Sequence, residues 1–299
     1  MKKKNLCLLA VLASGVLWGT IGVFNRYYGA LGIESYNLVT LRLSMGTALL
    51  FLYLAIRDPQ ALKLKLKDLW IFAGAGILSI IMFQTCYMIS IQHSEISIAA
   101  VLLYTSPLFV TIFSAIFFRD KITAKKIIGG TVTVVGCALA SGIIGSNGIP
   151  TIALITGMLA GVGYASYSIW ARAALNRGYK SITMTAYSFL FALVPLLFFA
   201  DYGTIVTGMK SDGWMAIVMW ILLALATEAL PYLLYTESLT GMDMSKAAIT
   251  VAIEPIVAGL IGICFYDEWK TMDWIKGLGM VLVIGSIVVM NLPKKEKQH

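Results

Sequence analysis

Long apolar stretches separated by short polar segments run through the whole chain. Stretches of about 20 apolar residues have the length needed to cross the hydrocarbon core of a bilayer. They occupy residues 6–27, 36–56, 69–91, 97–118, 126–144, 151–171, 182–201, 213–236, 245–266 and 273–292. The pattern predicts an all-α integral membrane protein with ten transmembrane helices.

The second half of the chain repeats the first. A shift of 148 positions places Tyr87 on Tyr235 and Pro107 on Pro255. Aromatic and proline matches carry more information than aliphatic ones in so apolar a chain. Each half holds five predicted spans, and an odd number makes the second copy enter the bilayer from the opposite side, as in the inverted repeats of secondary transporters. The two five-helix repeats are predicted at residues 1–145 and 146–299.

Composition and charge agree with this topology. The chain is 59% hydrophobic and only 13% charged, whereas soluble domains have about 25% charged residues. Most of the 23 Lys and Arg residues fall in the segments that share a side with the N-terminus. The positive-inside rule then predicts a multi-pass protein of the bacterial plasma (inner) membrane with both termini in the cytoplasm. No basic run alternates with aromatic platforms, so nucleic acid is not an expected partner.

The residues that an enzyme would need are scarce. His93 and His299 are the only histidines, so the sequence lacks the residues for a Ser/His catalytic pair or a histidine metal site. No phosphate-binding loop motif occurs. Glu228 and Glu254 could formally serve as the two carboxylates of an intramembrane protease. We nevertheless predict a non-enzyme with no metal and no cofactor.

Small residues mark two predicted helix contacts. Gly15 and Gly19 lie one turn apart in the first span, as Gly157 and Gly161 do in the sixth. Such spacing lets two helix backbones approach closely. Helix packing alone explains these glycines.

Pro107 and Pro255 stand in mid-span at equivalent positions of the two halves. Each removes a backbone hydrogen bond and bends its helix. Paired interruptions in inverted repeats indicate a place near the substrate site and a role in gating. A purely structural kink is the alternative.

Three charged residues stand out because they lie away from the ends of the spans: Arg42, Glu228 and Glu254. A charge at this depth costs about 2.5–3.5 kcal/mol on insertion scales, so each calls for a partner or a watery cavity. Counted from the expected span ends, Arg42 and Glu254 differ in height by about 7 Å, which an arginine side chain can bridge. An Arg42–Glu254 pair is therefore predicted, either functional or purely structural. No basic residue lies at the expected depth of Glu228, so its carboxyl is predicted to carry a proton.

Aromatic residues complete the candidate site. Trp18 and Tyr164 are in mid-span at equivalent positions beside the small-residue faces, and we expect them to line the substrate site together with Tyr232. Tyr87 and Tyr235 fall late in oppositely directed spans, which predicts a gate at each mouth. Anchoring at the membrane interface is the alternative for these two tyrosines.

Several motifs resemble the EamA branch of the drug/metabolite transporter superfamily. They are Pro231-Tyr232-Leu233-Leu234-Tyr235, Ala247-Ala248, Glu254-Pro255, Glu268, Trp18-Gly19 and Arg42. The resemblance covers the whole chain and implies a ten-helix inner-membrane carrier with a central cavity between its halves. It also implies export of amino acids or other small metabolites, often with proton exchange. Asp120, where the first half usually has Glu, and Glu228 depart from the family pattern.

We therefore expect a secondary active transporter that exports amino acids or related small metabolites by alternating access, with proton coupling as an open option. The predicted substrate-binding residues are Trp18, Arg42, Tyr164, Glu228, Tyr232 and Glu254. Import, or a drug, nucleoside or nucleotide-sugar substrate, is the alternative within transport. A non-transporting membrane sensor or scaffold is the alternative of another class. Expected partners are a small-molecule substrate and the lipid bilayer, and a homodimer is left open.

Overall fold

A computed structural model describes residues 2–141, 149–267 and 273–292. Within these ranges the chain is helical and has no strand, which confirms the all-α class. Eight helical stretches are long and apolar enough to cross a membrane: Lys3–Ala30, Tyr36–Arg57, Leu66–His93, Ile96–Phe118, Thr151–Asn176, Trp214–Ser238, Met244–Phe265 and Trp274–Asn291. The predicted repeat boundary at residues 145 and 146, and Glu268, lie outside the described residues.

Two of the ten predicted spans are shorter than the others. Helix α8 (Ala124–Ala140) has 17 residues and α10 (Ser181–Leu196) has 16. At 1.5 Å per residue they are about 24–26 Å long, less than the roughly 30 Å of a typical hydrocarbon core. The count of ten membrane-crossing helices therefore stays a prediction.

The remaining elements follow the predicted order. In the first half they are α1 (Lys2–Gly19), α2 (Ile21–Ala30), α3 (Ser35–Arg57), the 3-10 turns η1 (Pro59–Leu62) and η2 (Leu66–Asp68), α4 (Leu69–Ala73), the π-helix η3 (Gly74–Ile81), α5 (Met82–His93), α6 (Ile96–Leu103) and α7 (Ser106–Phe118). In the second half they are α9 (Thr151–Asn176), α11 (Tyr202–Asp212), α12 (Trp214–Ala224), the π-helix η4 (Leu225–Ala229), α13 (Leu230–Ser238), α14 (Met244–Val251), α15 (Glu254–Phe265) and α16 (Trp274–Asn291). Helix α11 occupies a segment that the sequence pattern assigned to a loop.

Helix interruptions recur at equivalent places in the two halves. Pro107 is the second residue of α7 and Pro255 is the second residue of α15. Because the first turn of a helix has no internal partner for its N–H groups, proline is tolerated there and the preceding helix ends. The predicted mid-span kinks are thus complete breaks between α6 and α7 and between α14 and α15.

The two π-helices are also related by the repeat. A shift of 148 places Ile77–Ile81 of η3 on Leu225–Ala229 of η4. A π-helix closes i→i+5 hydrogen bonds and occurs most often at functional sites. No feature of the apolar pattern predicts these segments.

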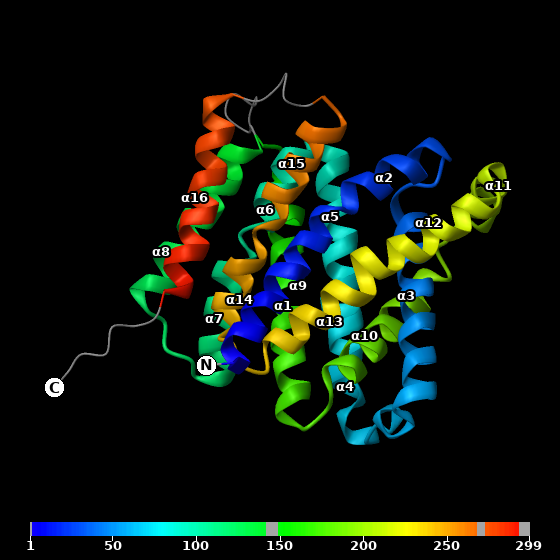
Figure 1. Cartoon of the computed structure of the whole chain (residues 1–299), viewed down its shortest axis with the longest axis horizontal. Helices are drawn as coiled ribbons and strands as arrows, with labels where there is room; N and C mark the ends of the chain where they lie inside the picture. The colour runs from blue at the N-terminus through cyan, green and yellow to red at the C-terminus, as the bar shows by residue number, and fades with distance from the viewer. Residues whose placement is uncertain (1, 142–148, 268–272, 293–299) are drawn as a thin grey trace.

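The helices form one bundle in which two groups of helices lie at opposite edges (Figure 1). Helices α8 and α16 pack side by side at one edge, and α3, α10 and α12 lie toward the opposite edge. Helices α1, α5 and α9 run between these groups. The start of α1 and the end of α16 lie at the same end of the bundle (Figure 1), as expected for an even number of crossings. Which side of the membrane this end faces stays a prediction.

Two of the predicted glycine contacts are symmetric. A Cβ atom on Gly15 would lie 2.7 Å from the backbone oxygen of Val251, and one on Gly161 would lie 2.8 Å from Thr105 Oγ1 and 3.1 Å from the backbone oxygen of Leu102. Helix α1 therefore packs closely against the chain where α14 ends, and α9 packs in the same way against the chain where α6 ends. These contacts confirm close helix packing at both glycines.

We expect Gly15→Ala to destabilise the protein and Gly22→Ala to stabilise it. The added methyl group at Gly15 has no room, and overpacking costs about 1–3 kcal/mol. At Gly22 in α2 no atom lies within 4 Å of the added Cβ, so the change gains about 0.5–1 kcal/mol of helix propensity. Unfolding midpoints of the two purified variants in one detergent test this, and shifts of the same sign would contradict it.

Candidate functional site

A cavity of about 460 Å³ lies between the two halves of the chain, within the size range of ligand pockets. All six predicted substrate-binding residues line it: Trp18, Arg42, Tyr164, Glu228, Tyr232 and Glu254. Residues far apart in the sequence thus share one site. Of the predicted gating residues, Tyr87 lines this cavity, whereas Tyr235, Pro107 and Pro255 do not.

Arg42 and Glu228 form a buried ion pair. Arg42 Nε lies 2.9 Å from Glu228 Oε1, and the two residues are 5% and 1% exposed. The prediction that Glu228 lacks a basic partner is therefore wrong. Residues Trp214–Ser238 would be about 37 Å long as a straight helix, and α12 and α13 run at a strong incline to α3 (Figure 1). A depth counted along an upright helix misplaces Glu228.

The pair leaves hydrogen-bonding capacity unused. Within the described part of the chain, neither Arg42 Nε nor Glu228 Oε2 has a hydrogen-bond partner, although both atoms are buried. The Nε–Oε1 contact is therefore electrostatic, without the alignment of a good hydrogen bond. An unsatisfied buried carboxylate oxygen is costly and marks Glu228 as a candidate to bind a ligand.

Glu254 stands on the opposite wall of the cavity. It is the first residue of α15 and is partly exposed to the cavity. None of the ion pairs in the described part of the chain includes it. The predicted Arg42–Glu254 pair is therefore wrong for this conformation. Similar depth does not bring two residues together when α3 and α15 lie on different sides of the bundle (Figure 1).

Trp18 is the centre of an aromatic floor under the cavity. Its ring packs edge-on against Tyr232, with centroids 5.1 Å apart, and also contacts the rings of Tyr164 and Tyr235. Its indole N–H donates a 3.0 Å hydrogen bond to the backbone oxygen of Thr227. That oxygen cannot receive the usual helical bond from position 231, because Pro231 has no N–H. The proline thus frees an acceptor that holds Trp18 in place.

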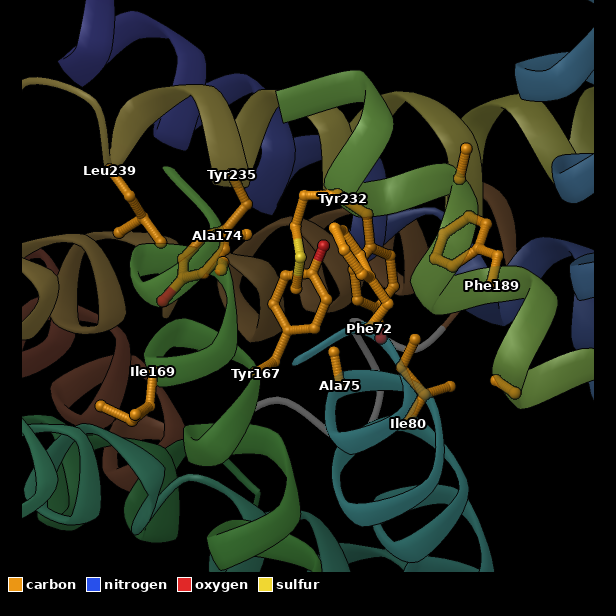
Figure 2. Packing of buried hydrophobic residues seen from close by; sticks show 14 of the residues in the cluster. Phe72, Ala75, Ile80, Tyr167, Ile169, Ala174, Phe189, Tyr232, Tyr235 and Leu239 are labelled. Carbon is orange, nitrogen blue, oxygen red and sulfur yellow. The ribbon is translucent and has the colours of Figure 1, made fainter. Parts of the chain in front are cut away.

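Behind this floor the chain is closely packed. The rings of Tyr167, Tyr232 and Phe189 lie close together (Figure 2). The hydroxyl of Tyr235 is hydrogen-bonded to Ser168 Oγ at 2.7 Å, and Tyr235 is 3% exposed. A void between these rings has a volume of about 10 Å³, too small for a substrate. The cavity is therefore closed at the end near the start of α1.

The other end of the cavity is its mouth. The cavity is lined there by Asn25 in the middle of α2, Glu34 before α3 and Gln92 near the end of α5. Tyr87 lies on this side of the floor and packs against Phe83, with ring centroids 5.9 Å apart. The two tyrosines predicted as gates thus occupy different environments, one on the open side and one on the closed side.

Sequence reasoning missed several lining residues on the first half, and two of them are informative. Gln84 of α5 lines the cavity, and the repeat shift of 148 places it on Tyr232, so the symmetry could have identified it. Tyr104 has the position of an interfacial residue in the apolar pattern, but it lines the cavity at the break between α6 and α7. Gln84 was therefore identifiable from the second half of the chain, whereas the same shift places Tyr104 on Ala252, which gives no such signal.

The membrane-length helices and the central cavity indicate a multi-pass membrane protein with a ligand site, and comparison with known proteins shows that it is a transporter. The chain belongs to the EamA-like transporter family, whose family model matches residues 5–142 and 151–292. An uncharacterized transporter of Archaeoglobus fulgidus is 26% identical over 275 residues, covering 91% of this chain and 92% of the relative. The threonine/homoserine exporter RhtA of Escherichia coli is 24% identical over 276 residues, covering 88% of this chain and 85% of the relative.

One further relative agrees with the family, and one solved structure shares the fold. The uncharacterized inner membrane transporter YicL of Salmonella typhimurium is 23% identical over 300 residues, covering 97% of this chain and 96% of the relative. A protein crystal structure matches with a TM-score of 0.74 at 13% identity, covering 95% of this chain and 96% of the other. At that identity the structural match supports the fold alone.

Proposed function

We propose that this transporter works by alternating access as a secondary active exporter in the bacterial inner membrane. The observation that carries the proposal is the cavity, which is open at one end and closed by the Trp18–Tyr232 floor at the other. Alternating access requires such a central site with one mouth closed. With both termini in the cytoplasm, the described conformation is open to the outside.

The substrate we propose is a small metabolite with a protonated amino group. The printed name of the Escherichia coli relative, threonine/homoserine exporter, supports amino acids as the first class to examine. Carboxylates on two walls suit an ammonium group, and the aromatic floor suits a compact carbon body. Trp18, Arg42, Tyr164, Glu228, Tyr232 and Glu254 are the proposed binding residues.

We place the coupling proton on Glu254. Arg42 lies 2.9 Å from the Glu228 carboxylate and neutralises it, so the ionised form of Glu228 is stabilised without a proton. Glu254 lacks an ion-pair partner within the described part of the chain. The polar groups that line the cavity with it include Arg42 of α3, Tyr87 of α5 and Tyr104 after α6.

Everted membrane vesicles test this function. We expect energised vesicles containing the protein to accumulate at least one labelled compound from a panel of amino acids and the corresponding amines. An uncoupler should reduce the accumulation to the level of vesicles without the protein, because the proton gradient drives it. Glu254→Gln should abolish accumulation but retain exchange of labelled for unlabelled substrate, since exchange needs no net proton movement.

Glu34→Gln at the mouth is the matched control and should leave driven accumulation within about twofold of wild type. Accumulation by the Glu254→Gln variant at the wild-type rate would show that another residue carries the coupling proton. Failure to accumulate any member of the panel would remove the proposed substrate class.

A further inference from the structure

The charged residues that line the cavity do not balance. They are Glu34, Arg42, Glu228 and Glu254. Arg42 and Glu228 neutralise each other in their ion pair, and Glu34 lies exposed at the mouth. Among the described residues, Glu254 therefore leaves one negative charge in the cavity without an ion-pair partner.

The cavity has unused acceptors on its carboxylates, whereas the unused donor, Arg42 Nε, lies 2.9 Å from Glu228 Oε1. Glu228 Oε2 is buried without a partner, and Glu254 takes part in none of the described ion pairs. Both side chains supply acceptors when ionised, and an ammonium group supplies donors only. A ligand carboxylate would instead need a cation, and Arg42 is the single cationic residue in the lining. It is already paired with Glu228.

The aromatic walls add a further preference for a cation. Trp18, Tyr87, Tyr104 and Tyr164 line the same cavity as Glu254. The face of an aromatic ring attracts a cation through its quadrupole, and the attraction grows when the cation is desolvated. The same faces repel a carboxylate placed over them.

We infer that the cavity selects monocationic amines over the corresponding zwitterionic amino acids, with Glu254 as the counter-ion of the ammonium group. The inference rests on the proposed function and narrows the proposed substrate class from amino compounds in general to monocationic amines. An amine brings one positive charge to a cavity that has one excess negative charge. An amino acid brings the same charge and adds a carboxylate for which no free cation remains.

Two matched sets of three ligands test this selectivity, each set sharing one carbon body. The aromatic set is 2-phenylethylamine, phenylalanine and 3-phenylpropionate, and the aliphatic set is isobutylamine, valine and isovalerate. Isothermal titration calorimetry of the purified protein in lipid nanodiscs at pH 7 measures each dissociation constant. In at least one set, we expect the amine to bind ten or more times as tightly as the amino acid, and the carboxylic acid not to bind.

Glu254→Gln should reduce the preference for the amine at least tenfold, because the uncompensated charge is gone. Glu254→Asp, which keeps the charge, should keep the preference, and Glu34→Gln at the mouth should not change it. If Glu254→Gln fails to fold, the ligand sets and Glu254→Asp still decide the matter.

Equal or tighter binding of the amino acid in both sets would overturn the inference, as would failure of both amines to bind at millimolar concentration. The vesicle experiment separates this failure from that of the proposed function. Driven accumulation of amino acids without amines would leave the exporter in place and remove the amine selectivity.

Discussion

Replacing Arg42 with methionine should lower the free energy of unfolding by about 3–5 kcal/mol, because it leaves the Glu228 carboxylate buried without a partner. Glu228 is 1% exposed and its Oε2 atom lacks a hydrogen bond among the described residues, so little of the carboxylate is solvated once the cation is removed. Glu228→Met should cost a similar amount by leaving the guanidinium unpaired. These are the largest stability effects that we expect from single substitutions in the cavity.

The double variant Arg42→Met, Glu228→Met should be more stable than either single variant, because an apolar pair of similar volume removes both desolvated charges. We expect the two changes to be non-additive by about 2–3 kcal/mol, measured from denaturant unfolding of the purified proteins in one detergent. Lys180→Met is the control, since its ion pair with Asp58 is at the surface and should contribute about 0–1 kcal/mol.

A second cycle that combines Arg42→Met with Glu254→Gln identifies the partner of Arg42. The structure predicts weak coupling in this cycle because Glu254 has no ion pair with Arg42. Stronger coupling to Glu254 than to Glu228 would contradict the arrangement of the cavity.

Much of the fold was predictable because the bilayer limits the solutions. Every backbone polar group in lipid must be satisfied within a helix, so apolar length alone locates the spans. The internal repeat then relates residues such as Pro107 and Pro255 through the sequence alone, and the helix breaks at both places confirm that relation. Short connections left few ways to arrange the segments.

The contacts within the site were less predictable. The repeat and the polar positions identified six residues that line one cavity, but the choice of partner for Arg42 was wrong. A depth counted along a straight, upright helix is wrong for Glu228, because Glu228 lies in the π-helix η4 of an inclined segment. Tilt, π-helical turns and lateral position depend on packing with other helices, and an apolar pattern along one helix contains none of that information.

The two tyrosines related by the repeat should exchange accessibility during transport. In the described conformation Tyr87 lines the open cavity, and Tyr235 is 3% exposed behind the Trp18 floor. We expect a membrane-impermeant maleimide added from outside to label Tyr87→Cys, and Tyr235→Cys to resist labelling from inside. Conditions that favour the opposite state, such as added substrate or a reversed proton gradient, should slow the first reaction and speed the second by about tenfold each.

The measurement needs a background without Cys7, Cys86, Cys137 and Cys264. Tyr202→Cys at the start of α11 is the control, because Tyr202 is 53% exposed and lies outside the cavity, so its labelling rate should not change with the state. Inverted repeats that rock about a central site open one mouth as they close the other, and this requires the two rates to move in opposite directions. Rates that stay constant at both tyrosines would indicate interfacial anchors and would leave the Trp18 floor as a fixed wall.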